Sequence, residues 1–441
     1  MTDSLTNSLL TSMKLSKIPK FYFPEGSVSG DILEQENNFI NDVFAAKDEL
    51  TLNEFLPFTR DFYHFPVLYN RVLFNKFDTQ KKGKVSKSQF IAFHNSNFRG
   101  VSNVKKYFAF IKDPSRKEIL PEDFKPFLDC LLDFNPSLDF LKKYPTYQTK
   151  YSETVILRIF YTNDTNDDGK LSLREFKKSN LIEILNKVSE NDINNVRDYF
   201  SYEHFYVIYC IFYELDSSRD VEKNETFISR ESFSKYDSHA IGDKVVDRIF
   251  GQIPRKFKST QRDKMCFEDF LYYILSEEDK TSSTSIKYWF KVLDLDDNGI
   301  VTPSEMEFFY EEQEKRLESY PIEVIKFNDV LCQLYDMIPP EKEYQWTLKN
   351  FLDHPESASI AFNSLFNLKK FIDNEEKDVF SKTEIDKNPE YTDWDKFAYY
   401  EYLRRMEEEG SNGGEEEISN GGDEGGIESN DEQSMNTQLS I

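Results

Sequence analysis

Residues 294–305 carry oxygen-bearing side chains at alternate positions, a spacing that suits a calcium ion. Calcium takes six to eight oxygen ligands, and a tight twelve-residue loop supplies them from positions one, three, five, seven, nine and twelve. Gly299 stands at position six, where the sharp bend favours a residue without a Cβ atom. The predicted ligands of this loop are Asp294, Asp296, Asn298, the carbonyl of Ile300, Thr302 and Glu305.

Residues 164–175 repeat the same arrangement, with glycine again at position six. The predicted ligands are Asp164, Asn166, Asp168, the carbonyl of Lys170, Ser172 and Glu175. Two complete matches in one chain favour a repeated architecture over a chance resemblance. We name residues 164–175 the first loop and residues 294–305 the second loop.

An acidic surface turn before a helix is the alternative interpretation of the second loop. Thr302, Pro303 and Glu305 also match an N-cap, a first-turn proline and a capping box. The flanking sequence decides between the two, because apolar residues recur at helical spacing on both sides of the loop. They are Ile286, Trp289, Phe290 and Leu293 before it, and Met306, Phe309 and Tyr310 after it. The pattern predicts a helix, a calcium loop and a second helix, with Val301 placed to pair with a neighbouring loop.

Several other stretches have the outline of the loop without its ligands. Residues 78–89 keep glycine at position six, but Lys82 at position five and Gln89 at position twelve cannot balance a divalent ion. Residues 113–124 repeat the outline loosely 35 residues later, and we expect these two copies to pack face to face as a structural pair. Three further degenerate copies are expected around the second loop, near residues 216–229, 265–270 and 346–351.

The composition indicates a folded, acidic protein of two or three units. The chain has 441 residues, 39% of them hydrophobic and 15% aromatic, which is ample for burial. Its net charge of −25 argues against a nucleic-acid partner, because phosphate binding needs clustered lysine and arginine. The four cysteines show no CxxC spacing, so neither a zinc site nor a disulfide framework is indicated.

No segment of the sequence predicts a membrane anchor or a signal peptide. The first 20 residues lack an apolar core, and no run approaches the ~20 apolar residues of a membrane helix. We therefore expect a cytoplasmic protein, with the nucleus and the centrosome as further locations. The predicted organisation is a disordered N-terminus (1–16), an extended strap with the first helices (17–60), an N-terminal lobe (61–198), a C-terminal lobe (199–372), a helical segment (373–405) and a disordered acidic tail rich in glycine and glutamate (406–441).

The sequence offers no recognisable catalytic motif. Its five histidines fall in no HExxH spacing, and it has neither a Walker loop nor a Gly-x-Ser-x-Gly turn. The two calcium loops supply a full set of ligands, which suits calcium sensing better than Lewis-acid catalysis. The chain is therefore predicted not to be an enzyme.

Longer stretches of the chain resemble the B-double-prime regulatory subunits of protein phosphatase 2A. The stretches that carry the resemblance are 18–24 (Ile-Pro-Lys-Phe-Tyr-Phe-Pro), 199–210, 276–280 (Ser-Glu-Glu-Asp-Lys), 288–290 (Tyr-Trp-Phe), 308–313 and 393–397 (Asp-Trp-Asp-Lys-Phe). The resemblance covers about residues 17–405 and implies an elongated, all-α array of EF-hand units in two lobes, with two calcium-competent hands. It also implies a non-catalytic subunit that joins the scaffold and catalytic subunits, brings phosphoprotein substrates to them and responds to calcium.

Two alternatives stay open. The chain could be a free-standing calcium-binding adaptor or buffer that has no phosphatase partner. Calcium could also be purely structural, with constant occupancy in the cell. The ligand pattern does not separate these alternatives from a sensor, because neither loop carries an evident defect in affinity.

Overall fold

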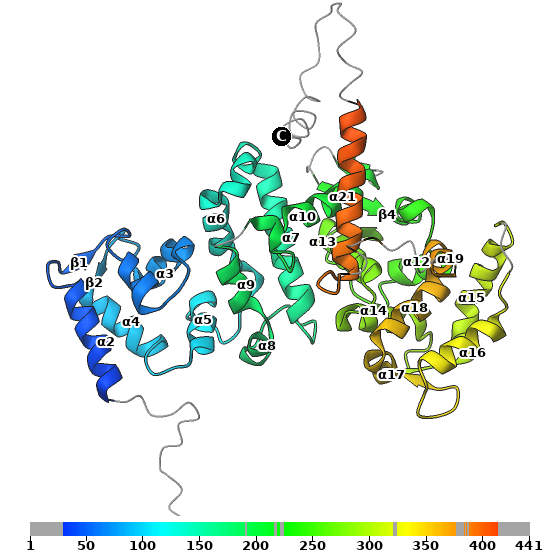
Figure 1. Cartoon of the computed structure of the whole chain (residues 1–441), viewed down its shortest axis with the longest axis horizontal. Helices are drawn as coiled ribbons and strands as arrows, with labels where there is room; N and C mark the ends of the chain where they lie inside the picture. The colour runs from blue at the N-terminus through cyan, green and yellow to red at the C-terminus, as the bar shows by residue number, and fades with distance from the viewer. Residues whose placement is uncertain are drawn as a thin grey trace, which may run out of the picture. The chain divides into compact units, whose positions relative to one another are not determined.

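A computed structural model describes residues 30–189, 192–215, 218–220, 225–320, 324–375, 383, 385 and 388–412. Over these residues the chain is mostly helical, with only very short strands (Figure 1). This confirms the predicted all-α class built from helix-loop-helix units. The predicted N-terminal segment (1–16) and residues 17–29 of the strap segment lie outside the described residues, as do residues 413–441 of the acidic tail.

The described chain divides into two compact units. The first unit comprises residues 30–136 and 170–189, and the second comprises residues 137–169 and 192–412. This division does not coincide with the predicted lobe boundary at residue 198. The reason is that helix α7 (Pro145–Asn163) packs against α10 (Tyr202–Glu214) and α13 (Phe267–Glu278), both of which belong to the second unit.

The first unit contains seven α-helices and two short strands among its described residues. The helices are α2 (Gly30–Val43), α3 (Asn70–Phe77), α4 (Lys87–Asn97), α5 (Asn103–Ile111), α6 (Lys125–Phe134), α8 (Leu173–Lys178) and α9 (Leu181–Lys187). The strands are β1 (Glu49–Leu50) and β2 (Val85–Ser86). Phenylalanine rings from these elements and from the π turn Phe58–Phe62 form its core. Phe77 stacks on Phe90 with ring centroids 4.7 Å apart, and Phe58 approaches Phe90 to 4.0 Å.

The second unit holds the remaining α-helices of the described chain. Besides α7, α10 and α13 they are α11 (Arg230–Phe233), α12 (Asp243–Phe250), α14 (Ser283–Leu293), α15 (Pro303–Leu317), α16 (Phe327–Met337), α17 (Leu348–Asp353), α18 (Pro355–Phe366), α19 (Leu368–Glu375) and α21 (Asp393–Asn412). Its strands are β3 (Ser218–Asp220), β4 (Glu225–Ser229), β5 (Lys264–Met265), β6 (Ile300–Val301) and β7 (Trp346–Thr347). Short 3-10 or π turns connect elements of the chain: η1 (Phe58–Phe62), η2 (Val67–Tyr69), η3 (Pro121–Phe124), η4 (Pro136–Lys143), η5 (Ile193–Asn195) and η6 (Tyr236–Ser238).

Loops of the helix-loop-helix units meet in pairs through short antiparallel backbone contacts. The paired residues are Leu50 with Val85, Ile119 with Leu171, Ile228 with Met265, and Val301 with Trp346. The predicted pairing role of Val301 is confirmed. Each contact ties two helix-loop-helix units into one block, because backbone hydrogen bonds join their loops.

The predicted pairing of loop 78–89 with loop 113–124 is wrong. Val85 of the earlier loop pairs with Leu50, and Ile119 of the later loop pairs with Leu171 of the first loop. An interval of 35 residues fits two neighbouring units, but it does not say which neighbour is the partner. An additional helix-loop-helix unit lies upstream, around β1. Loop 78–89 therefore pairs with that unit, and loop 113–124 pairs with the loop that follows it.

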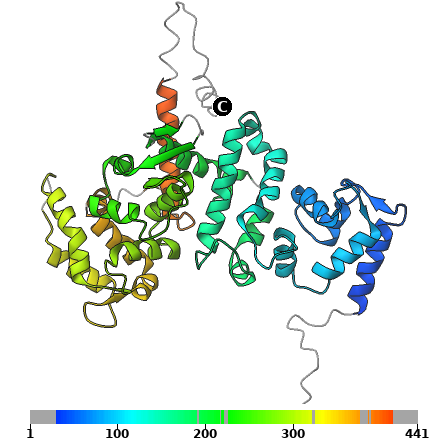
Figure 2. The same cartoon turned by 180° about the vertical axis from the view of Figure 1, so that it is seen from behind.

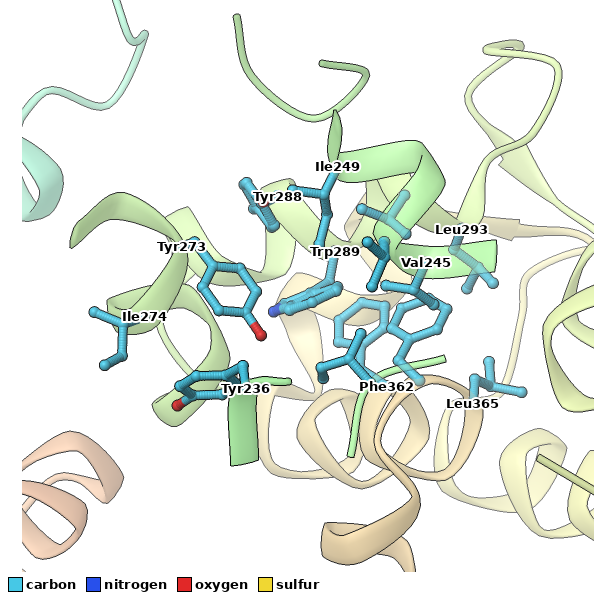
Figure 3. Close-up of a cluster of buried hydrophobic side chains, with 14 of the residues drawn as sticks. Tyr236, Val245, Ile249, Tyr273, Ile274, Tyr288, Trp289, Leu293, Phe362 and Leu365 are labelled. Atoms are coloured by element: carbon cyan, nitrogen blue, oxygen red, sulfur yellow. The ribbon is translucent and has the colours of Figure 1, made fainter. Parts of the chain in front are cut away.

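Trp289 lies at the centre of the second unit's core. Figure 3 shows its indole ring among Tyr273, Ile249 and Phe362, which come from three different helices. Its indole nitrogen donates a hydrogen bond of 2.7 Å to the carbonyl of Ser276, so the one polar atom of this buried ring is satisfied. The helical spacing around Trp289 that the sequence showed therefore reflects burial of one face of α14.

Helix α21 lies alongside α10 in the second unit, as the orange helix in both views shows (Figure 1, Figure 2). Arg405 donates to the carboxylate of Glu214, with one of the contacts at 2.8 Å. The helix continues to Asn412, so residues 406–412, predicted as part of the disordered tail, are helical. Met406 is followed by three glutamates, which are good helix formers. Within the described residues, no helix is both long and apolar enough to cross a membrane.

Candidate metal centres

The second loop brings three carboxylates together. Oxygen atoms of Asp294, Asp296 and Glu305 lie within 4.8 Å of one another. Asp294 and Glu305 are buried, and Asp296 is exposed. Asp294 directly follows the last residue of α14, and Glu305 stands in the first turn of α15, so the two helix ends position the site.

Hydrogen bonds inside the second loop fix its bend. Gly299 has φ of +79° and donates its N–H to Asp294 Oδ2 at 2.8 Å. Asn298 donates its N–H to Asp294 Oδ1 at 3.1 Å. A side chain with a Cβ is disfavoured at this φ, which is the reason for glycine at the sixth position. The residue type that the sequence singled out is thus required by the backbone.

The oxygen donors of the second loop fit a calcium ion. Buried carboxylates that lie close together repel one another, and burial raises the pKa of Asp294 above its ordinary value. A divalent cation removes that repulsion, and hard oxygen donors are the ligands calcium prefers. Asn298 and Thr302 are placed on the same loop, and Thr302 already donates its hydroxyl to Glu305 Oε2 at 2.9 Å.

The boundary between the two units falls between Gly169 and Lys170, so residues 164–169 of the first loop belong to the second unit and residues 170–175 to the first. In the second unit, Asp164 is buried and accepts from the N–H groups of Asp168 at 3.2 Å and Gly169 at 2.7 Å. The Asn166 amide donates to Asp168 at 3.2 Å. These contacts repeat the bend seen at Asp294 to Gly299.

The second half of the first loop belongs to the first unit. Ser172 caps helix α8, and its N–H and hydroxyl both donate to Glu175 Oε2, at 3.0 and 2.8 Å. Lys170 lies 3.7 Å from Glu118 on the paired loop. The assignment of Asp164, Asn166, Asp168, Lys170, Ser172 and Glu175 as calcium ligands stays a prediction.

Loop 78–89 has the backbone of a calcium loop without its charges. Gly83 has φ of +71° and donates to Asp78 Oδ2 at 2.6 Å, as the glycines of the first and second loops do to their aspartates. Ser86 caps the next helix together with Gln89, whose side chain takes the place of the glutamate. The loop keeps its shape without a carboxylate at position twelve.

We expect that restoring the ligands in loop 78–89 creates a calcium site. The changes are Gln80→Asp, Lys82→Asn and Gln89→Glu, made in a chain whose two predicted loops are silenced by Glu175→Gln and Glu305→Gln. Because the bend already exists, one ion should bind with a Kd of about 10⁻⁵ M or weaker, near the weak limit of sensor loops. Calorimetric titration measures this, with Lys82→Asn alone, made in the same silenced chain, as the control whose loop 78–89 should bind nothing. Absence of binding at millimolar calcium would contradict the argument that backbone shape is already in place.

A further loop, around β1, was not predicted from the sequence. Thr51 donates its N–H and hydroxyl to Glu54 Oε2, both at 2.9 Å, in the same way that Thr302 binds Glu305. Thr51 and Glu54 thus correspond to positions nine and twelve of a loop spanning residues 43–54. The spacing Thr-x-x-Glu was the available signal, but Val43, Ala45 and Lys47 replace the first three ligands, so the ligand pattern does not reveal it.

Arg248 is another residue that the motifs did not indicate. Its guanidinium donates to the carbonyls of Val292 at 3.0 Å, Lys291 at 2.8 Å and Asp294 at 2.6 Å. These carbonyls end helix α14, where the helix itself offers them no partner. Arg248 therefore holds the point at which α14 enters the second loop. No sequence pattern links position 248 to position 294.

The chain is similar to known proteins over most of its length. Residues 102–191 match an EF-hand domain, a range that contains loop 113–124 and the first loop. A probable B''delta regulatory subunit of serine/threonine protein phosphatase 2A from Arabidopsis thaliana is 42% identical over 89% of this chain and 73% of its own length. The B''alpha regulatory subunit of this phosphatase from Homo sapiens is 35% identical over 91% of this chain, which corresponds to 35% of that longer protein.

A solved structure extends the similarity to three dimensions. It is described as a PP2A PR70 holoenzyme with the label diCa, and one of its chains superposes on this one with a TM-score of 0.55. The two are 38% identical, and the match covers 62% of this chain and 98% of the other. Similarity thus holds in sequence over most of the chain and in fold over more than half of it.

Proposed function

Because this chain belongs to the B'' family of protein phosphatase 2A regulatory subunits, we propose that it joins the scaffold and catalytic subunits of that phosphatase in a calcium-responsive complex. As a regulatory subunit it acts through binding: it selects phosphoprotein substrates and contributes no catalytic group of its own. Neither nucleic acid nor a membrane is a partner in this proposal, and the cytoplasm, with the nucleus and centrosome, is its location.

The observation that carries the calcium part is the convergence of Asp294, Asp296 and Glu305 within 4.8 Å. Three carboxylates so close together, two of them buried, repel one another, and a bound cation would offset this repulsion. Calcium bound there would supply positive charge and would join oxygens from both sides of the loop. The proposed ligands are those given above for the first and second loops.

The response to calcium follows from where the ligands stand. Asp294 follows the last residue of α14 and Glu305 lies in the first turn of α15, so an ion that joins their oxygens restricts the angle between the two helices. A ligand shifts such an equilibrium only by its differential affinity for the two arrangements. The surface that α14 and α15 offer to a partner would therefore depend on calcium.

A capture experiment tests the proposal. The purified full chain is incubated with phosphatase scaffold and catalytic subunits in calcium and in chelator, beside the variants Glu175→Gln and Glu305→Gln. We expect capture that increases in calcium and weakens in at least one variant.

The other outcomes separate the alternatives. Capture indifferent to calcium would leave the phosphatase role and reduce the ions to a structural part. No capture in either buffer would reject the assembly and favour a free-standing calcium-binding adaptor or buffer.

A further inference from the structure

Helix α14 connects the first loop to the second. Near its start, Thr284 Oγ1 donates a hydrogen bond of 2.9 Å to the carbonyl of Tyr161, at the end of the helix that leads into the first loop. One turn later, Lys287 Nζ donates a hydrogen bond of 2.8 Å to the carbonyl of Thr165, inside the first loop. The helix ends at Leu293, and the next residue, Asp294, is position one of the second loop. All these residues belong to the second unit.

A second connection runs beside the first. Arg248 holds the last carbonyls of α14, as described above, and Lys291 Nζ lies 3.4 Å from the carbonyl of Pro254. The next residue, Arg255, places its Nε 3.6 Å from Asp167 Oδ1 in the first loop. Its guanidinium also lies over the ring of Tyr272 at 4.3 Å, which fixes its direction. The segment 248–255 thus contacts the first loop, at Asp167, and the end of α14 that leads into the second loop.

The connecting helix is rigid enough to transmit a shift. Its 11 residues span about 16 Å at 1.5 Å per residue. One face is buried in the core around Trp289, which is fully enclosed. A close-packed core resists continuous deformation, so a displacement at Lys287 is passed along the helix rather than absorbed beside it.

We propose that the two calcium sites are positively coupled through α14, and that Lys287 is the positioning residue that links the helix to the first loop. The inference rests on the proposed function, because it presupposes that both loops bind calcium. Ordering either loop fixes one end of α14 and lowers the ordering cost of the other loop when it binds. The coupling must be reciprocal, since linkage requires each ion to raise the affinity of the other by the same factor.

The positive charge of Lys287 allows its positioning role to be distinguished from a direct electrostatic effect on the calcium ion. An ammonium group close to a calcium loop repels the ion, so it does not favour binding by its charge. Removing it should raise the intrinsic calcium affinity of the first loop and, at the same time, weaken the coupling. A residue with no positional role would give only the first of these effects.

Calcium titration of the full chain by calorimetry measures the coupling. The affinity of the first loop is compared between the unchanged chain and Glu305→Gln, and that of the second loop between the unchanged chain and Glu175→Gln. Each ratio should be about 5- to 10-fold, at the lower end of measured coupling between sites. The two ratios should agree.

Variants at position 287 test whether the coupling between the two calcium sites passes through Lys287. Lys287→Met should lower both ratios, with Thr284 and Arg255 retaining part of the coupling, and Lys287→Arg, which keeps a donor, should retain most of it. Lys326→Met removes an exposed lysine that pairs with Glu314 and is part of neither loop, and should leave the ratios unchanged.

Ratios of one in the unchanged chain would overturn the coupling, and unchanged ratios in Lys287→Met would overturn the role of Lys287. Absence of any calcium binding would instead reject the calcium part of the proposed function, and this inference with it.

Discussion

Replacing Glu305 with glutamine is expected to lower the calcium affinity of the second loop by at least about 100-fold. Changes outside the ligand set cost metal sites about 10- to 100-fold, and Glu305 is a predicted direct ligand that supplies two oxygens. Glutamine keeps one carbonyl oxygen but removes the negative charge and the second oxygen acceptor. Most of the loss is expected from the weaker binding of the ion; the Leu295 N–H, which donates to Glu305 Oε1 at 2.8 Å, also loses its acceptor when the single amide oxygen faces Thr302.

Loop 78–89 shows why the variant should still fold. Gln89 occupies the same position there, and its Oε1 accepts from the Ser86 N–H at 2.9 Å and the Ser86 hydroxyl at 3.0 Å. In the second loop, the Thr302 N–H and hydroxyl make these contacts to Glu305 at 2.8 and 2.9 Å. Glutamine can thus preserve the cap of helix α15.

Two measurements check this prediction. Calorimetric titration should find one calcium site in Glu305→Gln where the unchanged chain has two. All three tryptophans, Trp289, Trp346 and Trp394, lie in the second unit, so their fluorescence during urea unfolding reports on that unit. Calcium at 1,000 times its Kd should stabilise this unit by about 4 kcal/mol per site coupled to its unfolding, and the variant should lose that share. Two intact sites in the variant would show that Glu305 is not a ligand.

The features predicted correctly from the sequence are those set by residues that lie close together in it. The ligand spacing at 294–305 located a loop whose carboxylates converge, and the apolar spacing around Trp289 located the buried face of α14. Glycine at position six was predicted from its spacing and is required by its positive φ. The resemblance to the B'' family is confirmed by relatives of 35–42% identity over most of the chain.

What the sequence did not predict depends on contacts between distant residues. The partner of each loop is set by which helices pack together, so Val85 met Leu50 and not the loop that follows it. The assignment of α7 to the second unit follows from its packing on α10 and α13. Arg248 reaches Asp294 across 46 residues, and a lone arginine on a helix carries no mark of its target.

The largest loss of stability is expected from Lys280→Met, in the second unit. Lys280 and Glu277 are both buried, and the ammonium lies 2.6 Å from Glu277 Oε2. Lys280 also donates to the carbonyl of Glu277 at 3.0 Å and lies over the Trp289 ring at 4.9 Å. Removing one partner of a buried ion pair costs up to about 3–5 kcal/mol, because the other partner loses compensating charge.

The other residues around Glu277 are already engaged and cannot take the place of Lys280. Lys370 lies 3.1 Å from Glu277 Oε1 and 2.8 Å from Glu278 Oε2, and Asn367 donates to Glu277 Oε1 at 2.8 Å. These partners occupy Oε1, so Oε2 would lose its cation in Lys280→Met. The buried methionine fills the volume of the stem without replacing the charge. Lys370 still balances part of the charge through Oε1, but Oε2 is left buried without a partner, which costs free energy.

The same cluster predicts how stability depends on pH. Burial by itself raises the pKa of Glu277, but Lys280 and Lys370 outweigh it, so the pKa lies below its ordinary value of 4.5. A carboxyl whose pKa is lower in the folded state stabilises the fold above its ordinary pKa. That contribution is lost as the pH falls through the lower folded-state pKa. In Lys280→Met part of the lowering disappears, so the acid loss of stability that comes from Glu277 should be smaller and should be complete at a higher pH.

Lys369→Met is the matched control for Lys280→Met. Lys369 is a neighbouring lysine of the same unit, but it is 58% exposed and pairs with Asp237 at 2.6 Å. Exposed pairs contribute about 0–1 kcal/mol, so this variant should unfold close to the unchanged chain in urea. Tryptophan fluorescence follows both variants at neutral and acidic pH. Equal, small losses in the two variants would mean that the buried cluster stabilises the fold no more than a surface ion pair does.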